Sequence, residues 1–182
     1  MYDSASRNIT VAQIRAPCFR EGRNEFVQQL VQWIKSSGFA KVYILSSAFS
    51  QTLSDLSPEE TTSPIRFLAT KDTEVPGVKP VQRVERFTLK PTDAASGILH
   101  LPGGGLTRKL FHELEKLAVD CTVLIKYCSE GDNTPDAFHL VETINTLVHV
   151  KDVSKVTAGR TSWDVPISWS GLYGGAAPDG IY

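Results

Sequence analysis

Apolar residues along the chain follow two periods, which alternate from one segment to the next. Spacing near 3.6 residues predicts helices over 24–37, 106–117 and 135–148. Short apolar or alternating runs favour strands over 8–14, 41–45, 65–69, 84–89, 98–101 and 121–127. The polar or Pro/Gly-rich segments 46–64 and 70–83 are predicted to be loops. Strands that alternate with helices predict an α/β domain with a mostly parallel sheet and helices on both faces.

Residues typical of helix ends flank two of these helices. Asn24 is predicted to cap the first helix, and Gly38 is predicted to follow it in the left-handed conformation. Thr134 is predicted to cap the last helix, because Pro135 suits the first helical position. The middle helix has one apolar face, formed by Leu106, Leu110, Phe111, Leu114 and Leu117.

The composition limits the number of domains and the classes of partner to be expected. A chain of 182 residues that is 41% hydrophobic can bury one sizeable core. We assign residues 1–150 to an α/β domain and 151–182 to an aromatic, Gly/Pro-rich C-terminal tail that packs on it. A net charge of −1 gives no indication of a nucleic-acid or anionic-membrane partner. No apolar run approaches the roughly 18 residues of a membrane span, and the polar start is not a signal peptide.

The cysteines indicate a reducing compartment. Cys18, Cys121 and Cys128 are odd in number and lack the Cys-x-x-Cys spacing of metal sites. Such an arrangement suits buried thiols better than a disulfide framework or a zinc site. We therefore expect a soluble, intracellular protein.

A glycine turn precedes the middle helix and is the first candidate site. Pro102, Gly103, Gly104 and Gly105 connect an apolar run to the helix, so backbone N–H groups at a helix start could bind an anion. The dinucleotide fingerprint is incomplete, because Arg108 stands where its third glycine belongs, and the Gly-Lys-Ser/Thr of a P-loop is absent. The turn is therefore either a phosphate cradle or a structural turn that needs glycine for its backbone.

A second candidate loop lies between the last predicted strand and the last helix. It consists of Ser129, Glu130, Gly131, Asp132 and Asn133. Its carboxylates could hold a metal ion, but they lack the number and spacing of a calcium loop. The alternative is a solvated loop that caps the following helix.

The other chemical motifs are incomplete. His112 and Glu113 begin like a zinc-protease helix, but Lys116 occupies the place of the second histidine. The four histidines, His100, His112, His139 and His149, share no ligand spacing. The serines at 46–47 follow a strand without the Gly-x-Ser-x-Gly elbow of a hydrolase. The sequence therefore predicts no catalytic, cofactor-binding or metal-binding residue.

The C-terminal tail suggests a binding role instead. Trp163, Trp169 and Tyr173 are expected to clamp the tail to the body. The chain then ends Pro-Asp-Gly-Ile-Tyr, so that Ile181 and Tyr182 could enter a pocket on a partner together with the terminal carboxylate. The alternative is a frayed end without a role.

Several segments together resemble the proteasome assembly chaperone 2 family. These are 31–38 (Val-Gln-Trp-Ile-Lys-Ser-Ser-Gly), the serines at 46–47, 101–107 (Leu-Pro-Gly-Gly-Gly-Leu-Thr), 126–137 (Lys-Tyr-Cys-Ser-Glu-Gly-Asp-Asn-Thr-Pro-Asp-Ala) and 162–169. The similarity runs from about residue 7 to residue 182, and the order and separation of Pro-Gly-Gly-Gly and Ser-Glu-Gly-Asp-Asn make it specific.

The resemblance implies a three-layer α/β/α domain that acts as a chaperone without catalysis. It also implies a heterodimer with proteasome assembly chaperone 1 on the outer face of the proteasome α-ring. There the pair would promote correct assembly of the α-subunits, discourage off-pathway association, and leave as the core particle matures. The implied location is cytoplasm and nucleus, and no cofactor is implied. The alternative is an α/β enzyme that binds a nucleotide or another small molecule at the Gly103–Gly105 turn.

The chain departs from the family in two places. Family members usually carry several tens of further residues at the N-terminus, including an apolar strand and helix, so we expect a truncated gene model. The docking tails of the family end with a hydrophobic residue, a tyrosine and any final residue. Here Ile181 is followed by Tyr182 as the last residue, so the docking role carries over as a hypothesis.

Overall fold

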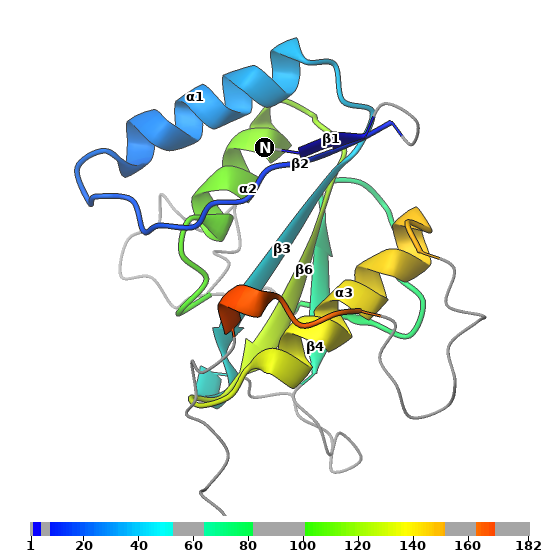
Figure 1. Cartoon of the computed structure of the whole chain (residues 1–182). Helices are drawn as coiled ribbons and strands as arrows, with labels where there is room; N and C mark the ends of the chain where they lie inside the picture. Colours follow the sequence, from blue (N-terminus) through cyan, green and yellow to red (C-terminus); the bar gives the residue numbers. More distant parts are fainter. Residues whose placement is uncertain (1, 5–7, 53–63, 82–100, 152–162, 170–182) are drawn as a thin grey trace, which may run out of the picture. The chain divides into compact units, whose positions relative to one another are not determined.

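The computed structural model describes residues 2–4, 8–52, 64–81, 101–151 and 163–169 (Figure 1). The chain forms two compact units, residues 1–128 and residues 129–182. The predicted strand at 84–89, and all of the predicted strand at 98–101 except its last residue, lie outside the described residues. The predicted division between a body and a tail at residue 150 stays a prediction.

The first unit contains most of the regular structure. Its strands are β1 (Tyr2–Ser4), β2 (Ile9–Val11), β3 (Val42–Phe49), β4 (Ile65–Ala69), β5 (Lys79–Pro80) and β6 (Cys121–Cys128). Its helices are α1 (Arg23–Ser36), the 3₁₀ turn η2 (Ser50–Thr52) and α2 (Thr107–Lys116). The second unit contains α3 (Thr134–Val148) and the 3₁₀ turn η4 (Ile167–Trp169). Within the described part of the chain, no helix is long and apolar enough to cross a membrane.

The central sheet has the strand order β3-β6-β4-β5. β3 and β6 pair in parallel from Val42 opposite Cys121 to Phe49 opposite Cys128. β4 and β5 are also parallel, whereas β6 and β4 are antiparallel. A separate antiparallel pair joins β1 and β2. The predicted α/β class, with a central, mostly parallel sheet flanked by helices, is confirmed.

The core of the first unit lies between the sheet and the helices α1 and α2, which lie side by side (Figure 1). β6 is central, and every residue from Cys121 to Tyr127 is buried. The predicted face of α2 supplies Leu110, Phe111 and Leu114 to this core. The face predicted for α1, with Phe26, Leu30, Trp33 and Ile34, is only partly right, because the buried stripe is Val27, Val31 and Ile34. Their burial against β6 confirms the helical periods and the buried central strand.

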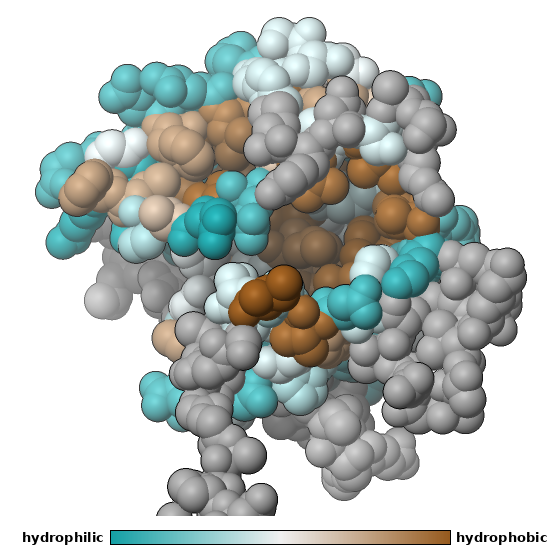
Figure 2. Space-filling model, in the orientation of Figure 1, coloured by the Kyte–Doolittle hydropathy of each residue, from teal (hydrophilic) through white to brown (hydrophobic). Residues whose placement is uncertain are grey.

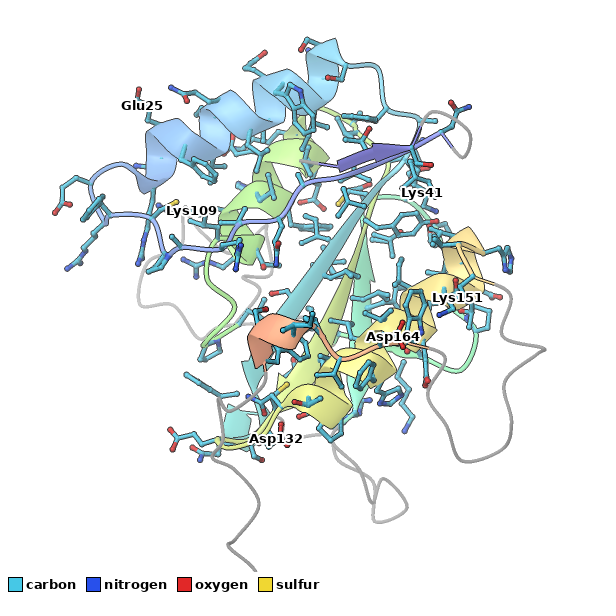
Figure 3. The ribbon with its side chains drawn as sticks, viewed as in Figure 1. Glu25, Lys41, Lys109, Asp132, Lys151 and Asp164 are labelled. Carbon is cyan, nitrogen blue, oxygen red and sulfur yellow. The ribbon has the colours of Figure 1, made fainter. Side chains whose placement is uncertain are left out.

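The ends of α1 match the sequence prediction only at the C-terminus. Gly38 follows the helix with φ +67°, the left-handed conformation that was predicted for it. The predicted cap at Asn24 is wrong, because the helix begins at Arg23 with Gly22 as its N-cap. The side-chain oxygen of Asn24 instead accepts a hydrogen bond from Lys109 Nζ of α2 (Figure 3). Asn24 therefore links two helices rather than closing one.

Two segments predicted as loops take part in the sheet. β3 continues to Phe49 instead of ending at Leu45, because its backbone goes on pairing with β6. β5 covers Lys79–Pro80 and pairs with β4 at the sheet edge, where a proline without an N–H is tolerated. In both segments, pairing with a neighbouring strand overrides a polar or proline-containing sequence.

In the second unit, α3 begins one residue earlier than predicted. Asn133, not Thr134, is the N-cap, and Pro135 lies in the first turn. After the helix, His149 adopts a left-handed conformation with φ 49°. The buried Asn145 amide then donates to the Lys151 carbonyl at 2.8 Å and accepts from the Lys151 N–H at 2.9 Å. This pair of bonds fixes the direction of the chain beyond α3.

A threonine holds the beginning of β6. Thr70 Oγ1 accepts a hydrogen bond from the Cys121 N–H at 2.9 Å and donates one to the Val119 carbonyl at 2.7 Å. Asp120, between them, is partly buried and forms ion pairs with Lys41 at 3.9 Å and Lys71 at 3.4 Å. The Thr70 N–H also donates to the Cys121 carbonyl at 2.9 Å, so this one residue makes both backbone and side-chain contacts with the start of the strand.

We predict that Thr70→Val destabilises the fold. The isosteric side chain would leave the Cys121 N–H and the Val119 carbonyl without this partner, at a cost of about 1–3 kcal/mol. Urea unfolding would measure the difference. Thr70→Ser is the matched control, because it restores the hydroxyl. Equal stability of the valine and serine variants would contradict the prediction.

Candidate functional site

The Pro102–Gly105 turn leads directly into α2, and two of its glycines need a conformation that other residues avoid. Gly103 has φ +82° and Gly105 has φ +56°. Both values lie in the left-handed region, where an L side chain is strained. The turn is closed by a hydrogen bond from the Gly104 N–H to the Leu101 carbonyl at 3.1 Å.

Protein fills the space beside Gly103 and Gly104, whereas a Cβ on Gly105 would meet no atom within 4 Å. A Cβ added to Gly104 would lie 2.5 Å from Leu101 Cδ2 and 3.2 Å from the Leu101 carbonyl oxygen. A Cβ at Gly103 would lie 3.2 Å from the ring of Phe49. Gly104 is also buried, unlike its two neighbours. The glycines thus permit close packing against an aliphatic and an aromatic side chain.

The same turn is attached to β3. The Phe49 N–H donates a hydrogen bond to the Pro102 carbonyl at 3.2 Å. Ser46 Oγ and Thr107 Oγ1, on β3 and the first residue of α2, lie 2.7 Å apart and share a hydrogen bond. Ser46 therefore has a partner at the start of a helix.

These contacts bear on the phosphate-cradle interpretation. Leu101 and Phe49 are apolar groups lying against Gly104 and Gly103, where a cradle would need open polar space. The Thr107 N–H, first in α2, already donates to the Gly104 carbonyl at 3.0 Å. The geometry favours the structural interpretation of the turn.

The Ser129–Asn133 loop caps α3. Asp132 Oδ1 accepts a hydrogen bond from the Thr134 N–H at 2.9 Å. Hydrogen bonds from the side chain and the backbone of Thr134 hold the pKa of Asp132 below its ordinary value. Gly131 has φ +121°, and all five loop residues are exposed. The arrangement is that of a solvated capping loop, the second of the two sequence interpretations.

The described residues contain no group of three or more His, Cys, Asp or Glu side chains that could hold a metal ion. His112 Nδ1 lies 3.8 Å from Glu115 on the same helix, and His149 ends α3. Of the three thiols predicted to be buried, Cys121 is buried and Cys18 and Cys128 are only partly so. Desolvation raises the pKa of the Cys121 thiol to about 12. A thiol with that pKa carries almost no thiolate at neutral pH and is a poor nucleophile.

The aromatic tail is described only between 163 and 169. There, the Trp163 ring lies 5.2 Å from Lys151 Nζ, a cation–π contact that places the indole beside the end of α3 (Figure 3). Tyr173 and the predicted partner-binding residues Ile181 and Tyr182 lie outside the described residues. Their role stays a prediction.

Two kinds of residue were missed by sequence reasoning. Phe49 was not assigned to the turn, because strand β3 was expected to end at Leu45. The bond of Thr107 to Ser46 was not foreseen, because it joins residues distant in the sequence. Two buried cations, Arg66 and Lys126, also went unnoticed. They lie on neighbouring strands, and the register of β4 and β6 places them on opposite faces. The available signal was a charge inside an otherwise apolar strand, as in Ile65–Ala69.

Solved structures identify the class of the fold. Crystal structures of Pyrococcus furiosus PbaA, described as an archaeal homolog of proteasome-assembly chaperone, superpose with TM-scores of 0.53 and 0.52. The two structures are 17% and 18% identical in sequence to this chain. The superposed parts make up 76% and 78% of this chain and 55% and 51% of the PbaA chains. The chain thus spans about half the length of these structures and shares their fold.

Sequence comparison identifies the family. Proteasome assembly chaperone 2 of Homo sapiens is 32% identical over an aligned length of 192 residues. The alignment covers all of this chain and 71% of the human protein. The protein of that name from Danio rerio is 33% identical, and the match covers 98% of this chain and 69% of the relative. A model of the PAC2 family matches residues 1–155. The chain belongs to the PAC2 family.

We predict that Gly104→Ala lowers stability. The new methyl group would overlap Leu101, and overpacking of this kind costs about 1–3 kcal/mol. Adding Leu101→Ala to the Gly104 variant should recover part of the loss in urea unfolding. Purely additive effects of the two substitutions would contradict the overlap.

We also predict that the pKa of the Asp132 carboxyl lies below its ordinary value of 3.8. Because the pKa of Asp132 is lower in the folded than in the unfolded state, the ionised carboxylate stabilises the fold. This stabilisation is complete above the pKa of the unfolded state and is lost as the pH falls through the pKa of the folded state. NMR titration of the Asp132 carboxyl should show this pKa, and the Thr134 amide should follow it. Asp132→Asn, which keeps an acceptor oxygen, should abolish the titration of that amide. A carboxyl pKa at or above 3.8 would contradict the capping bond.

Proposed function

We propose that this chain is a proteasome assembly chaperone that forms a heterodimer with proteasome assembly chaperone 1. The pair would bind proteasome α-subunits, promote their assembly into the α-ring, and dissociate as the core particle matures. The proposal includes no catalysis and no cofactor, and it places the protein in cytoplasm and nucleus. The α/β unit supplies the broad partner surface, and the C-terminal tail supplies a second contact.

The observation that carries the proposal is the family match. It extends over residues 1–155, which include the glycine turn, β6 and the Ser129–Asn133 loop. Curated relatives with this match are named proteasome assembly chaperone 2. Two moderate contacts in one assembly give avidity without making either contact tight, which suits a partner that later leaves.

The packing of the glycine turn supports a chaperone over a nucleotide-binding enzyme. Gly103 and Gly104 are needed for contact with Phe49 and Leu101, so their presence is explained without a ligand. The alternative, a nucleotide-binding enzyme, predicts a different effect of ligands on the melting temperature. Nucleotides or phosphosugars would raise the melting temperature by several degrees if they bound the turn, and such a rise would count against the proposal.

The tail is proposed as a local anchor. Ile181 offers an apolar side chain, and Tyr182 offers an aromatic ring beside the terminal carboxylate. A pocket that receives a C-terminal residue can recognise all three groups together. The heterodimer surface would remain when the anchor is removed, so the two contacts are separable.

We predict that deleting residues 180–182 lowers the recovery of α-subunits by about tenfold in co-purification, through loss of avidity. Recovery of proteasome assembly chaperone 1 should stay unchanged. Tyr182→Ala should reproduce most of the loss, whereas Ile181→Leu should retain binding, since it keeps an apolar side chain of equal size.

Unchanged recovery of α-subunits by the truncated chain would refute the anchor. Loss of both partners together would indicate that the truncation damages the body instead. Failure of the full-length chain to recover any proteasome subunit would refute the proposed function itself.

A further inference from the structure

The connection between β2 and α1 carries several exposed apolar side chains. Phe19 in this connection is 87% exposed, and Val11 and Ile14, shortly before it, are about half exposed. A single exposed apolar residue is ordinary on a protein surface, but several of them close together in the chain indicate a contact surface. Figure 2 shows apolar and hydrophilic surface side by side at the left of the view, where the connection lies in Figure 1.

Arginines flank this apolar surface. Arg15, Arg20 and Arg23 lie within residues 12–24, where Glu21 is the one carboxylate. All three arginines are exposed, and in the described part of the chain no ion pair engages any of them. The connection is therefore locally positive, although the whole chain has a net charge of −1.

Hydrogen bonds attach the end of this connection to the helices. Arg23 Nε donates a long hydrogen bond, 3.4 Å, to the Cys18 carbonyl, which ties the residue before Phe19 to the first residue of α1. Asn24, the next helical residue, accepts a hydrogen bond from Lys109 Nζ of α2 at 2.5 Å, which adds another cation beside the start of α1 (Figure 3). A surface that is already fixed in this way loses less conformational entropy when a partner binds.

The chemistry of these side chains favours an acidic protein segment as the partner. Guanidinium groups bind carboxylates through two parallel hydrogen bonds, and groups of arginines are a recurring means of recognising acidic peptide motifs. Aromatic residues and arginine are also enriched in protein–protein interfaces. A nucleic acid or an anionic membrane fits less well, because such long polyanions are attracted by extended positive charge and the whole chain has a net charge of −1.

We propose that Arg15, Phe19, Arg20 and Arg23 form a docking surface, here called the arginine surface, for an acidic peptide segment of another protein. An apolar side chain of that segment packs on the exposed Phe19 ring, and the carboxylates on either side of it pair with the guanidinium groups. The inference does not rest on the proposed function, because neither the C-terminal tail nor the family match plays a part in it.

An NMR titration of the isotope-labelled full chain with a defined probe tests this surface. The probe is the peptide Glu-Asp-Glu-Leu-Phe-Glu-Asp-Glu, which should shift the amide signals of residues 14–24 in a saturable way. The matched peptide Gln-Asn-Gln-Leu-Phe-Gln-Asn-Gln has the same shape without the charges and should bind about tenfold or more weakly. A thymidine oligonucleotide serves as the nucleic-acid probe and should bind more weakly than the acidic peptide.

Substitutions separate the contributions of charge and of the ring. Phe19→Ala and Arg20→Ala should each weaken binding of the acidic peptide by about three- to tenfold, whereas Phe19→Leu should retain most of it. Lys35→Ala is the matched control, because Lys35 is an exposed cation in the last turn of α1, at the other end of the helix. Since Phe19 and Arg20 are exposed, these variants should melt at the temperature of the wild type.

Several results would overturn the arginine surface, and the first three need only the wild-type chain. The acidic peptide could leave the signals of residues 14–24 unshifted at millimolar concentration. The uncharged peptide could bind as tightly, which would remove the role of the arginines. Tighter binding of the oligonucleotide would make this a nucleic-acid surface instead. Equal weakening by Lys35→Ala and Arg20→Ala would reduce the effect to the net charge of the chain.

Discussion

Strand β6 is the element on which the rest of the first unit depends. It pairs in parallel with β3 on one side and antiparallel with β4 on the other, so most of its backbone polar groups are satisfied within the sheet. All of Cys121–Tyr127 is buried, and the apolar stripes of α1 and α2 pack against its alternate residues. Thr70 fixes the start of this strand, and the glycine turn determines where α2 begins beside it. A shift of β6 by one residue would exchange its two faces and disrupt both helices.

The elements with a strong hydrophobic period were predicted from the sequence. Features that depend on contacts with residues distant in the sequence were missed. The leucine stripe of α2 and the apolar run of β6 are local patterns, and both were found where expected. The extension of β3 through Ser46 and Ser47 depends on backbone pairing with β6, which side-chain polarity does not reveal. The cap of α1 was misplaced because Asn24 has a tertiary partner, Lys109, that no local rule includes. The roles of Phe49 and Leu101 beside the glycines likewise required the three-dimensional arrangement.

The glycine turn illustrates how packing decides between two functional interpretations. Pro102–Gly105 before a helix has the composition of an anion site, and the sequence left that interpretation open. In the structure, an aliphatic and an aromatic side chain lie against Gly104 and Gly103, and hydrogen bonds attach the turn to β3. The glycines therefore join two elements closely. This agrees with a PAC2-family protein whose proposed work is binding rather than chemistry.

The parallel pairing of β3 with β6 also affects the order in which the chain can fold. Between them the polypeptide passes through β4, β5 and α2, so the two strands are distant in sequence and their pairing closes a long loop. During synthesis β3 leaves the ribosome well before β6 exists. Its uncharged residues then have neither neighbour, and both of its edges are open to other nascent or unfolded chains. Slow formation of the β3–β6 pair follows from this topology.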